Sequence, residues 1–182
     1  MKAFYFILIA AMLSFMACTQ QEKTTDTDYT TANAGDAPLP DYVQQVLNSE
    51  TLSDTVIKTE AQWRKELSPE QYYVLRQEGT EQPFNNKYNG NKERGIYYCA
   101  ACHNPMFSSD TKFESGTGWP SFYAPVDKKR VKEVQDRSMG EVRTEVECAR
   151  CGSHIGHVFP DGPEPTGLRY CLNSAALAFE KK

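Results

Sequence analysis

The residues whose types and spacing suggest chemistry gather near the C-terminal end of the chain, between Cys148 and Asn173. This stretch holds a Cys-x-x-Cys pair, a His-x-x-His pair and a closing run in which polar and apolar residues alternate. If residues 168–172 form a strand, its period of two places Arg169, Cys171 and Asn173 on one face. A thiol, a cation and a carboxamide would then share one surface.

Cys171 is the candidate nucleophile on that surface. The thiolate is the reactive form of cysteine, and a guanidinium two residues away favours the thiolate over the thiol. We therefore expect Arg169 to depress the pKa of Cys171, while Tyr170 and Leu172 point the other way into a core. The alternative is an ordinary buried cysteine that packs as a small hydrophobic side chain. A reactive thiol would indicate an enzyme, and an inert one a binding module.

The first 17 residues are typical of an export signal. Lys2 supplies a positive start, and the apolar run that follows is shorter than the about 20 residues that a membrane-spanning helix needs. Residues 15–18, Phe-Met-Ala-Cys, are similar to a bacterial lipobox, which predicts that Cys18 is acylated and begins the mature chain. The alternative is a plain cleaved signal with an incidental cysteine. We expect a protein of the cell envelope that a lipid anchors to a membrane.

A polar segment, residues 18–40, follows this leader. It is rich in Thr, Gln, Asp and Ala and has almost no large apolar side chain, which is typical of a flexible tether with a reach of roughly 25 Å. Residues 41–182 are then long enough for one domain with its own core. The formal net charge of −4 argues against a nucleic-acid partner.

The cysteine count separates one residue from the others. The chain has six cysteines, and five remain once Cys18 is set apart. Four of these form the pairs Cys99/Cys102 and Cys148/Cys151, which leaves Cys171 alone. Two Cys-x-x-Cys turns can close a tetrahedral Zn²⁺ site of four sulfurs at about 2.3 Å, and His103 is not needed as a ligand. The alternative is a pair of redox-active Cys-x-x-Cys motifs.

Local signals predict short helices followed by a mainly β domain. A weak apolar pattern over 41–50 and capping boxes at Thr59/Gln62 and Ser68/Gln71 predict three helices, the last ending near Gly79. From residue 95 onward, short aromatic and β-branched runs are broken by Gly, Pro, Asn and Asp, which is typical of antiparallel sheets. The expected strands are 95–100, 112–114, 122–125, 131–136, 140–147, 157–159 and 168–172.

Three motifs, together with the cysteine pairs, resemble the methionine-R-sulfoxide reductases. They are Ser-Gly-Thr-Gly-Trp-Pro-Ser-Phe at 115–122, His-x-x-His-x-Phe-x-Asp-Gly-Pro at 154–163 and Arg-Tyr-Cys-x-Asn-Ser at 169–174. The resemblance runs from about Leu67 to Phe179. It implies a two-sheet, β-tent-like fold, a structural zinc, and reduction of the R epimer of methionine sulfoxide in peptides and proteins.

Reduction of a sulfoxide needs a nucleophile, a proton donor and a pocket for an apolar methyl group. His154 and His157 are the available acids near neutral pH, and a bulge at Gly156 would turn both inward. The alternative is that each is a structural histidine, and that Trp119 belongs to the core. The resemblance implies that Asp161 orients groups within the substrate site, whose lining it assigns to Trp119, His154, His157, Phe159, Arg169 and Asn173.

One position departs from the family pattern. Many members carry a second, resolving cysteine between the two glycines of the Ser-Gly-x-Gly-Trp-Pro loop, and here that position is Thr117. A sulfenic acid on Cys171 would then need an external thiol, either a small molecule or a thioredoxin-like protein. The competing hypothesis is a zinc-stabilised β domain that binds a partner without catalysis.

Overall fold

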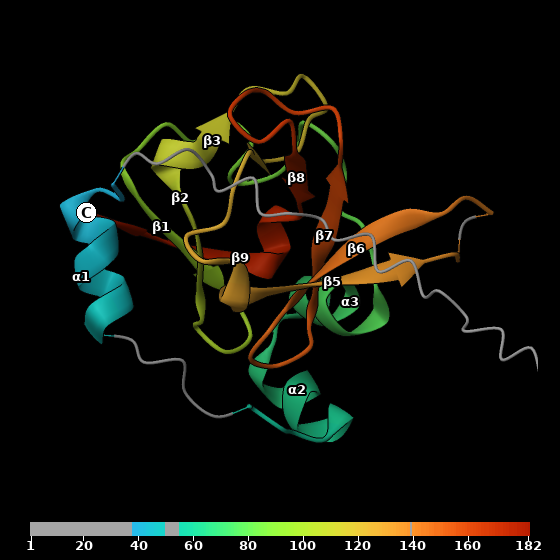
Figure 1. Ribbon diagram of the computed structural model, residues 1–182. Coiled ribbons are helices and arrows are strands. Elements are labelled where there is room, and N and C mark those ends of the chain that lie inside the picture. The colour runs from blue at the N-terminus through green and yellow to red at the C-terminus, as the bar shows by residue number, and fades with distance from the viewer. Residues whose placement is uncertain (1–37, 50–54, 139) are drawn as a thin grey trace, which may run out of the picture. The chain divides into compact units, whose positions relative to one another are not determined.

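The computed structural model describes residues 38–49, 55–138 and 140–182 (Figure 1). The predicted leader, the lipidation site Cys18 and residues 18–37 of the predicted tether lie outside the described residues. Within the described ranges, no helix is both long enough and apolar enough to cross a membrane. The described ranges cover the predicted catalytic domain of residues 41–182 except for 50–54 and 139.

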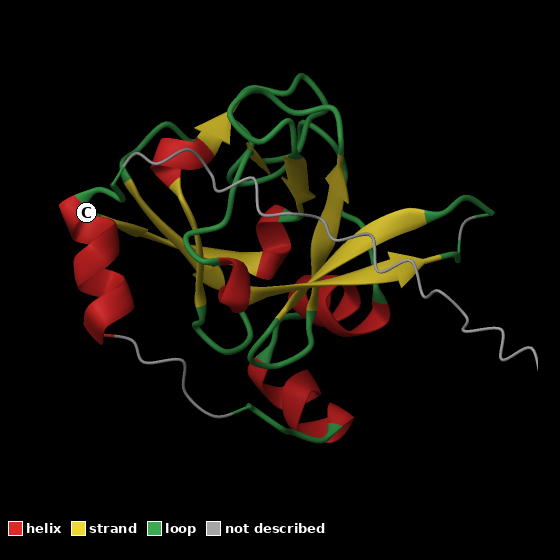
Figure 2. Ribbon diagram, viewed as in Figure 1, coloured by secondary structure: helices red, strands yellow, loops and turns green. Residues whose placement is uncertain are grey.

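Two antiparallel sheets form the framework (Figure 2). The first has three strands in the order β2 (Pro105–Ser108), β1 (Gly95–Cys99) and β9 (Leu177–Lys181). The second has six in the order β3 (Lys112–Phe113), β4 (Ser121–Phe122), β8 (Arg169–Leu172), β7 (His154–Phe159), β6 (Arg143–Cys148) and β5 (Val131–Asp136). The prediction of a mainly β fold with two antiparallel sheets is confirmed.

Three short helices precede the sheets: α1 (Asp41–Ser49), α2 (Glu60–Glu66) and α3 (Pro69–Gln77). Both predicted capping boxes are present, with Thr59 and Ser68 accepting from the backbone of the third helical residue. Glu78, with a φ of 55°, adopts the left-handed conformation at the end of α3, one residue before the glycine expected there. Single 3-10 turns are η1 (Ser109–Thr111), η2 (Lys128–Arg130) and η3 (Ser174–Ala176).

The predicted strands differ from the observed ones where the local pattern is weak. β2 was not predicted, because it begins with a proline and is buried at all four positions, so it shows no alternation. β9 was not predicted either, and its burial falls steadily toward its end. β7 begins at His154, three residues earlier than expected, because an irregular register extends its pairing with β6.

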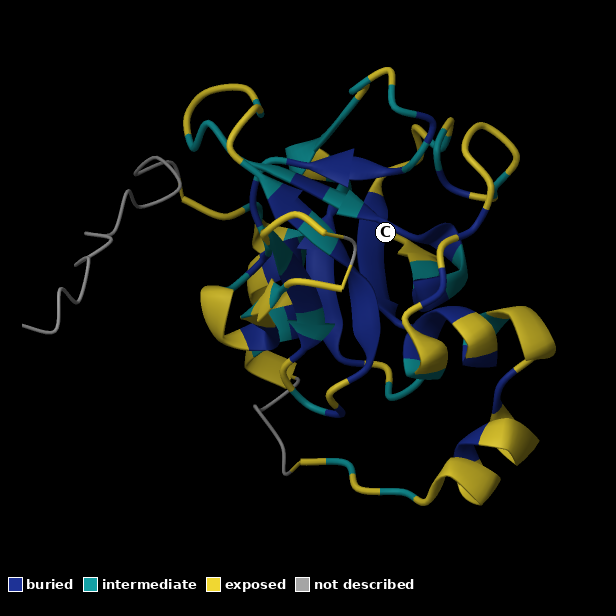
Figure 3. Cartoon of the chain, turned by 90° about the vertical axis from the view of Figure 1, so that its right-hand side faces the viewer, coloured by how far each residue is buried: buried dark blue, intermediate teal, exposed yellow. Residues whose placement is uncertain are grey.

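Aromatic side chains fill the main core. The ring of Phe122 lies 5.0 Å from that of Tyr97 and 4.9 Å from that of Phe107, so the core joins the two sheets. Figure 3 shows these central strands as buried and the helices with exposed outer faces. Tyr170 and Leu172 of β8 point into this core, as predicted. The alternate residues of β8 therefore face the other side of the sheet, where the candidate site lies.

Candidate active site

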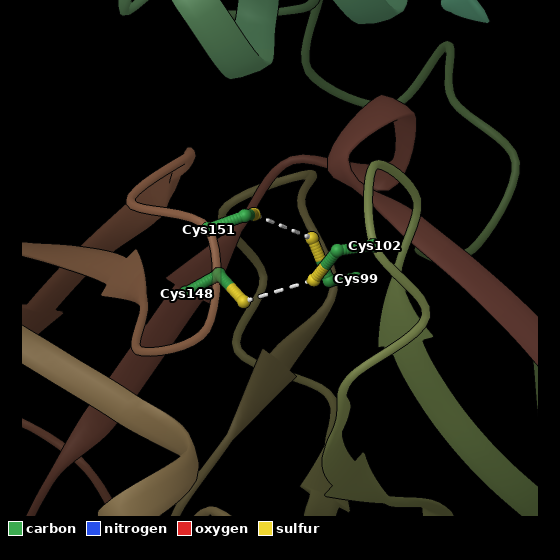
Figure 4. A group of neighbouring side chains, drawn as sticks. All are labelled: Cys99, Cys102, Cys148 and Cys151. Atoms are coloured by element: carbon green, nitrogen blue, oxygen red, sulfur yellow. Dashed lines mark hydrogen bonds between the residues drawn. The ribbon is translucent and has the colours of Figure 1, made fainter. Parts of the chain in front are cut away.

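The four paired cysteines converge on one point (Figure 4). The Sγ atoms of Cys99 and Cys151 are 3.8 Å apart, those of Cys102 and Cys148 are 3.5 Å apart, and all four lie within 4.8 Å of one another. A tetrahedron with bonds of about 2.3 Å separates its sulfurs by about 3.8 Å. The sulfurs are too far apart for disulfides. Their spacing therefore fits a zinc ion rather than two redox pairs.

The two cysteine turns share one backbone design. The N–H of His103 donates to the carbonyl of Cys99, and the N–H of Gly152 donates to the carbonyl of Cys148, each at about the same distance (2.8 and 2.9 Å). His103 and Gly152 both have left-handed φ angles, 60° and 66°. The imidazole of His103 turns away and lies 3.1 Å from Glu180, so it is not a ligand. Each turn thus presents two sulfurs to the same centre.

The surroundings suit a buried metal–thiolate group. Cys99, Cys148 and Cys151 are buried, and the side-chain N–H of Asn104 donates to Sγ of Cys148 at 3.4 Å. Four thiolates in so dry a place repel one another unless a cation neutralises them. The donor set, four sulfurs without an oxygen or nitrogen, is one that Zn²⁺ prefers. We find that the residues present fit the predicted structural zinc.

A separate cavity of about 140 Å³ lies over β7 and β8. Its volume equals that of four or five waters at about 30 Å³ each, which is room for the end of one side chain. Its lining consists of Thr80, Trp119, Arg143, Gly156, His157, Phe159, Cys171, Leu172 and Asn173. Two of these, His157 and Cys171, are directly opposite each other across the β7–β8 ladder. A thiol and an imidazole therefore share one small cavity.

The environment of Cys171 differs from our expectation in one respect. Burial raises the pKa of the Cys171 thiol, and this effect outweighs the hydrogen bond from Thr117 and the charge of Arg169, which both lower it. Oγ1 of Thr117 is 3.8 Å from Sγ. The prediction of a net depressed pKa for Cys171 is wrong. Loss of water around the thiolate destabilises it more than the positive charge of Arg169 stabilises it. Burial therefore favours the thiol over the thiolate at Cys171.

A bulge in β7 positions the histidines. Val146 pairs with Gly156, whereas the next residue of β6, Glu147, pairs with His154, so β7 carries one extra residue there. The imidazole rings of His154 and His157 consequently lie 5.4 Å apart and edge to face. The bulge that the glycine was expected to permit is confirmed. A Cβ on Gly156 would lie 2.2 Å from the carbonyl oxygen of Cys171, so only glycine fits between the strands.

The two histidines have different positions. His157 lines the cavity, whereas His154 is 4% exposed and lies behind it, with Nδ1 2.6 Å from Oε1 of Glu145. Burial raises the pKa of Glu145 and lowers that of His154, so it disfavours the charged form of each residue. Burial also lowers the pKa of His157. His157 is therefore the histidine that can meet a substrate.

Arg169 and Asp161 form an ion pair beside Phe159, one of the residues that line the cavity. Nε and Nη2 of Arg169 each lie 2.8 Å from a carboxylate oxygen of Asp161, and the guanidinium covers the ring of Phe159 at 4.4 Å. The hydrogen bonds from Arg169 lower the pKa of Asp161. Neither Arg169 nor Asp161 is among the residues that line the cavity, and Arg169 is committed to this pair. Arg169 also lowers the pKa of Cys171, but burial of the thiol outweighs this effect.

The backbone of Glu81 joins two further site residues. The indole N–H of Trp119 donates to the carbonyl of Glu81 at 3.1 Å, and the N–H of Glu81 donates to the side-chain oxygen of Asn173 at 3.2 Å. The Glu81 carboxylate accepts from the N–H groups of Ser174 and Ala175 at the start of η3. Burial raises the pKa of Glu81. This residue fixes an aromatic wall and a carboxamide at the same cavity.

Comparison with known proteins agrees with this geometry. A family model described as the SelR domain matches residues 67–181, well over half of the chain. The chain belongs to the SelR family, the methionine-R-sulfoxide reductases. The resemblance inferred from the three sequence motifs is confirmed.

Curated relatives match this SelR family chain over nearly their own whole length. Those from Agrobacterium fabrum, Thiobacillus denitrificans and Methanosarcina mazei, each named "Peptide methionine sulfoxide reductase MsrB", are 54%, 60% and 61% identical to it. The matches cover 72%, 69% and 69% of this chain and 98%, 95% and 89% of the respective relatives. The expectation of an oxidoreductase of this family is confirmed, and the hypothesis of a non-catalytic binding module is set aside.

Among solved structures, the Mis18 "Yippee-like" domain aligns at a TM-score of 0.41 and 18% identity. The alignment covers 50% of this chain and 98% of that one. A likeness this low supports no conclusion about function.

Some of the site residues that we predicted for this SelR family member line the cavity, and others lie outside it. The cavity brings together Trp119, His157, Phe159, Cys171 and Asn173, and it leaves His154, Arg169 and Asp161 outside its lining. Sequence reasoning missed Thr80, which follows α3 in a loop without a recognisable signal. It also missed Arg143, which pairs with Asp136 across the β5–β6 ladder.

Proposed function

We propose that this chain reduces methionine-R-sulfoxide in peptides and proteins, with Cys171 as the nucleophile. The observation that carries the proposal is the shared cavity of Cys171, His157 and Trp119. Its size admits the end of a methionine sulfoxide side chain, and its lining offers an aromatic wall for the S-methyl group. MsrB-type enzymes act on one sulfoxide epimer, which a cavity lined differently on each side can select.

In the proposed step, the Cys171 thiolate attacks the sulfoxide sulfur. The oxygen is a poor leaving group until it is protonated, and His157 is placed to donate that proton. One thiolate, one sulfoxide and one proton give methionine and a sulfenic acid on Cys171. The thiol sulfur loses two electrons and the sulfoxide sulfur gains them. The amide of Asn173 adds a hydrogen-bonding group to the same cavity wall.

The four-cysteine cluster takes no part in this step. Cys99, Cys102, Cys148 and Cys151 would hold one Zn²⁺, which supplies folding free energy by pinning the end of β1 to the end of β6. These ligands belong to a structural site, because all four positions are occupied by sulfur and none of the four residues lines the cavity around Cys171.

An external thiol completes the proposed cycle. The sulfenic acid reacts with one thiol to give a mixed disulfide and water, and a second thiol releases Cys171 as the thiol. Thr117, which lies beside Cys171, cannot form the disulfide that a cysteine there would form. The reductant is thus a small thiol or a thioredoxin-like protein.

We further propose that Cys18 carries a lipid and anchors the enzyme at the cell envelope, where oxidised exported proteins would be its substrates. Support comes from the leader and the lipobox-like residues 15–18. Cys18→Ala should move the protein from the membrane fraction to the soluble fraction, with Cys171→Ser as a control that stays membrane-bound. A Cys18→Ala variant that remains in the membrane fraction after leader cleavage would point to a different anchor.

Turnover of the two separated epimers of a methionine sulfoxide peptide tests the activity itself. The wild-type protein should consume the R epimer in the presence of dithiothreitol and leave the S epimer unchanged. Cys171→Ser should be inactive while its zinc content and melting temperature match the wild type, because a hydroxyl is a far weaker nucleophile at neutral pH. Residual turnover within about tenfold of wild type would remove Cys171 from the mechanism.

A further inference from the structure

The end of the β5–β6 hairpin carries a carboxylate that no motif in the sequence marked. Asp136 is the last residue of β5 and pairs with Arg143, the first residue of β6. Oδ2 of Asp136 lies 2.9 Å from Nε2 of His157 and 2.6 Å from Nη2 of Arg143. Its other oxygen, Oδ1, accepts from the N–H and the hydroxyl of Ser138 at 2.8 and 2.6 Å. The side chain is 11% exposed.

These contacts decide which partner holds the proton. Both oxygens of Asp136 face donors, and the hydrogen bonds from Ser138, His157 and Arg143 hold the pKa of Asp136 well below its usual range. Asp136 is therefore an ionised acceptor, and the hydrogen between it and His157 belongs to Nε2 of the imidazole. With Nε2 so engaged, Nδ1 is the ring nitrogen left for the substrate.

We propose that Asp136 is a positioning residue for the sulfoxide reduction. It fixes the tautomer and the ring orientation of His157, and its negative charge stabilises the imidazolium that donates the proton. Arg143 and Ser138 hold Asp136 in place, so the hairpin end acts through His157 on the cavity. This inference rests on the proposed function, in which His157 protonates the sulfoxide oxygen.

The other groups around His157 make this support necessary. Burial and the positive charge of Arg143 lower the pKa of His157, whereas Asp136 raises it. From β7 itself His154 faces the ring, and its Nδ1 is hydrogen-bonded to Glu145 of β6. From β8 the thiol of Cys171 lies opposite. Asp136 is thus the one anionic side chain hydrogen-bonded to His157 among the described residues.

The first test compares Asp136→Asn with Glu141→Gln. Glu141 lies 3.8 Å from Nε of Arg143, so its variant removes a carboxylate from the same guanidinium without touching His157. Asp136→Asn should lower kcat by at least about tenfold with little change in KM, because general acid catalysis typically contributes 10² to 10⁴-fold. The acidic limb of its kcat/KM profile should move to lower pH. Glu141→Gln should stay within about twofold of wild type.

Two further variants separate this inference from the proposed function. His157→Asn and the double variant Asp136→Asn/His157→Asn should be equally slow, because Asp136 acts only through His157. If His157→Asn is as active as wild type, the proposed acid role fails. If His157→Asn is slow but Asp136→Asn keeps the wild-type rate and pH profile, the positioning role of Asp136 is overturned and the acid role stands.

A measurement on the wild-type protein covers the case in which Asp136→Asn does not fold. The chain has three histidines, so ring nitrogens labelled with ¹⁵N can be assigned with the single variants His103→Gln and His154→Gln. Neutral His157 should carry its proton on Nε2. A proton on Nδ1 of neutral His157 would overturn the inference.

Discussion

Replacement of Thr117 by cysteine should give Cys171 an internal resolving partner. Oγ1 of Thr117 is 3.8 Å from Sγ of Cys171, and the residue lies in a loop between Gly116 and Gly118, whose φ angles of 75° and 89° suit a tight turn. A sulfur in place of the hydroxyl would extend further toward Cys171. We expect one turnover to convert the variant to a 117–171 disulfide, whereas the wild type stops at sulfenic acid.

The size of the effect on stability follows from the loop that the disulfide closes. Residues 117 and 171 are 54 positions apart. The chain-entropy relation then gives a stabilisation of about 4 kcal/mol in the free energy of unfolding, less any strain. For a protein of this size, that corresponds to a rise in Tm of roughly 10 °C.

Mass spectrometry and thermal melting of oxidised and reduced Thr117→Cys test this expectation, with Thr117→Ser as the matched control. The control keeps a hydroxyl at the same place and should melt at the same temperature in both states. A Thr117→Cys protein that accumulates a dimedone-reactive sulfenic acid without disulfide would refute the placement of Thr117 beside Cys171. Equal melting temperatures of its disulfide and dithiol forms would refute the entropy argument.

Three other consequences can be measured. Cys148→Ser should lose zinc and much of its stability, because the free energy of metal binding in such sites contributes directly to the free energy of folding. A cooperative melt of the wild type that is unchanged by chelator would contradict this. Gly156→Ala should lower the free energy of unfolding, measured by chemical denaturation, by about 3 kcal/mol or more and reduce activity, since its Cβ would lie 2.2 Å from the backbone of Cys171. A variant as stable as the wild type would show that the strands can separate. The kcat/KM profile should be bell-shaped, because burial lowers the pKa of His157 and raises that of Cys171 while the step needs imidazolium and thiolate together. Below the His157 pKa the imidazolium is fully formed and the rate falls with the thiolate fraction, and above the Cys171 pKa the thiolate is fully formed and the rate falls with the imidazolium fraction. A rate that rises steadily with pH would exclude His157 as the acid.

Local sequence signals predicted much of this fold because they act over a few residues. The capping boxes at Thr59 and Ser68 satisfy helix N–H groups from within the same turn, so they need no tertiary contact. The alternation around Cys171 likewise predicted which residues of β8 face the core. The strand at 105–108 was missed because both of its faces are buried and its residues therefore show no alternation, although its neighbour in the sheet, β1, directly precedes it in the chain.

The electrostatics of the site depend on contacts that sequence spacing does not show. Arg169 is two residues from Cys171, but its guanidinium is bound to Asp161, and burial decides the direction of the Cys171 pKa. The position of His154 behind His157 depends on the bulge in β7, and its partner Glu145 comes from the adjacent strand. These effects arise only when the sheet is assembled.

The most direct test of the proposed mechanism is a single turnover without reductant. Wild-type protein mixed with excess R-sulfoxide peptide should form one methionine per protein, and the peptide containing Cys171 should gain one oxygen, trapped as a dimedone adduct, with zinc retained. A disulfide between Cys171 and one of the four zinc-site cysteines, with release of zinc, would contradict the account, as would methionine formation without any change at Cys171.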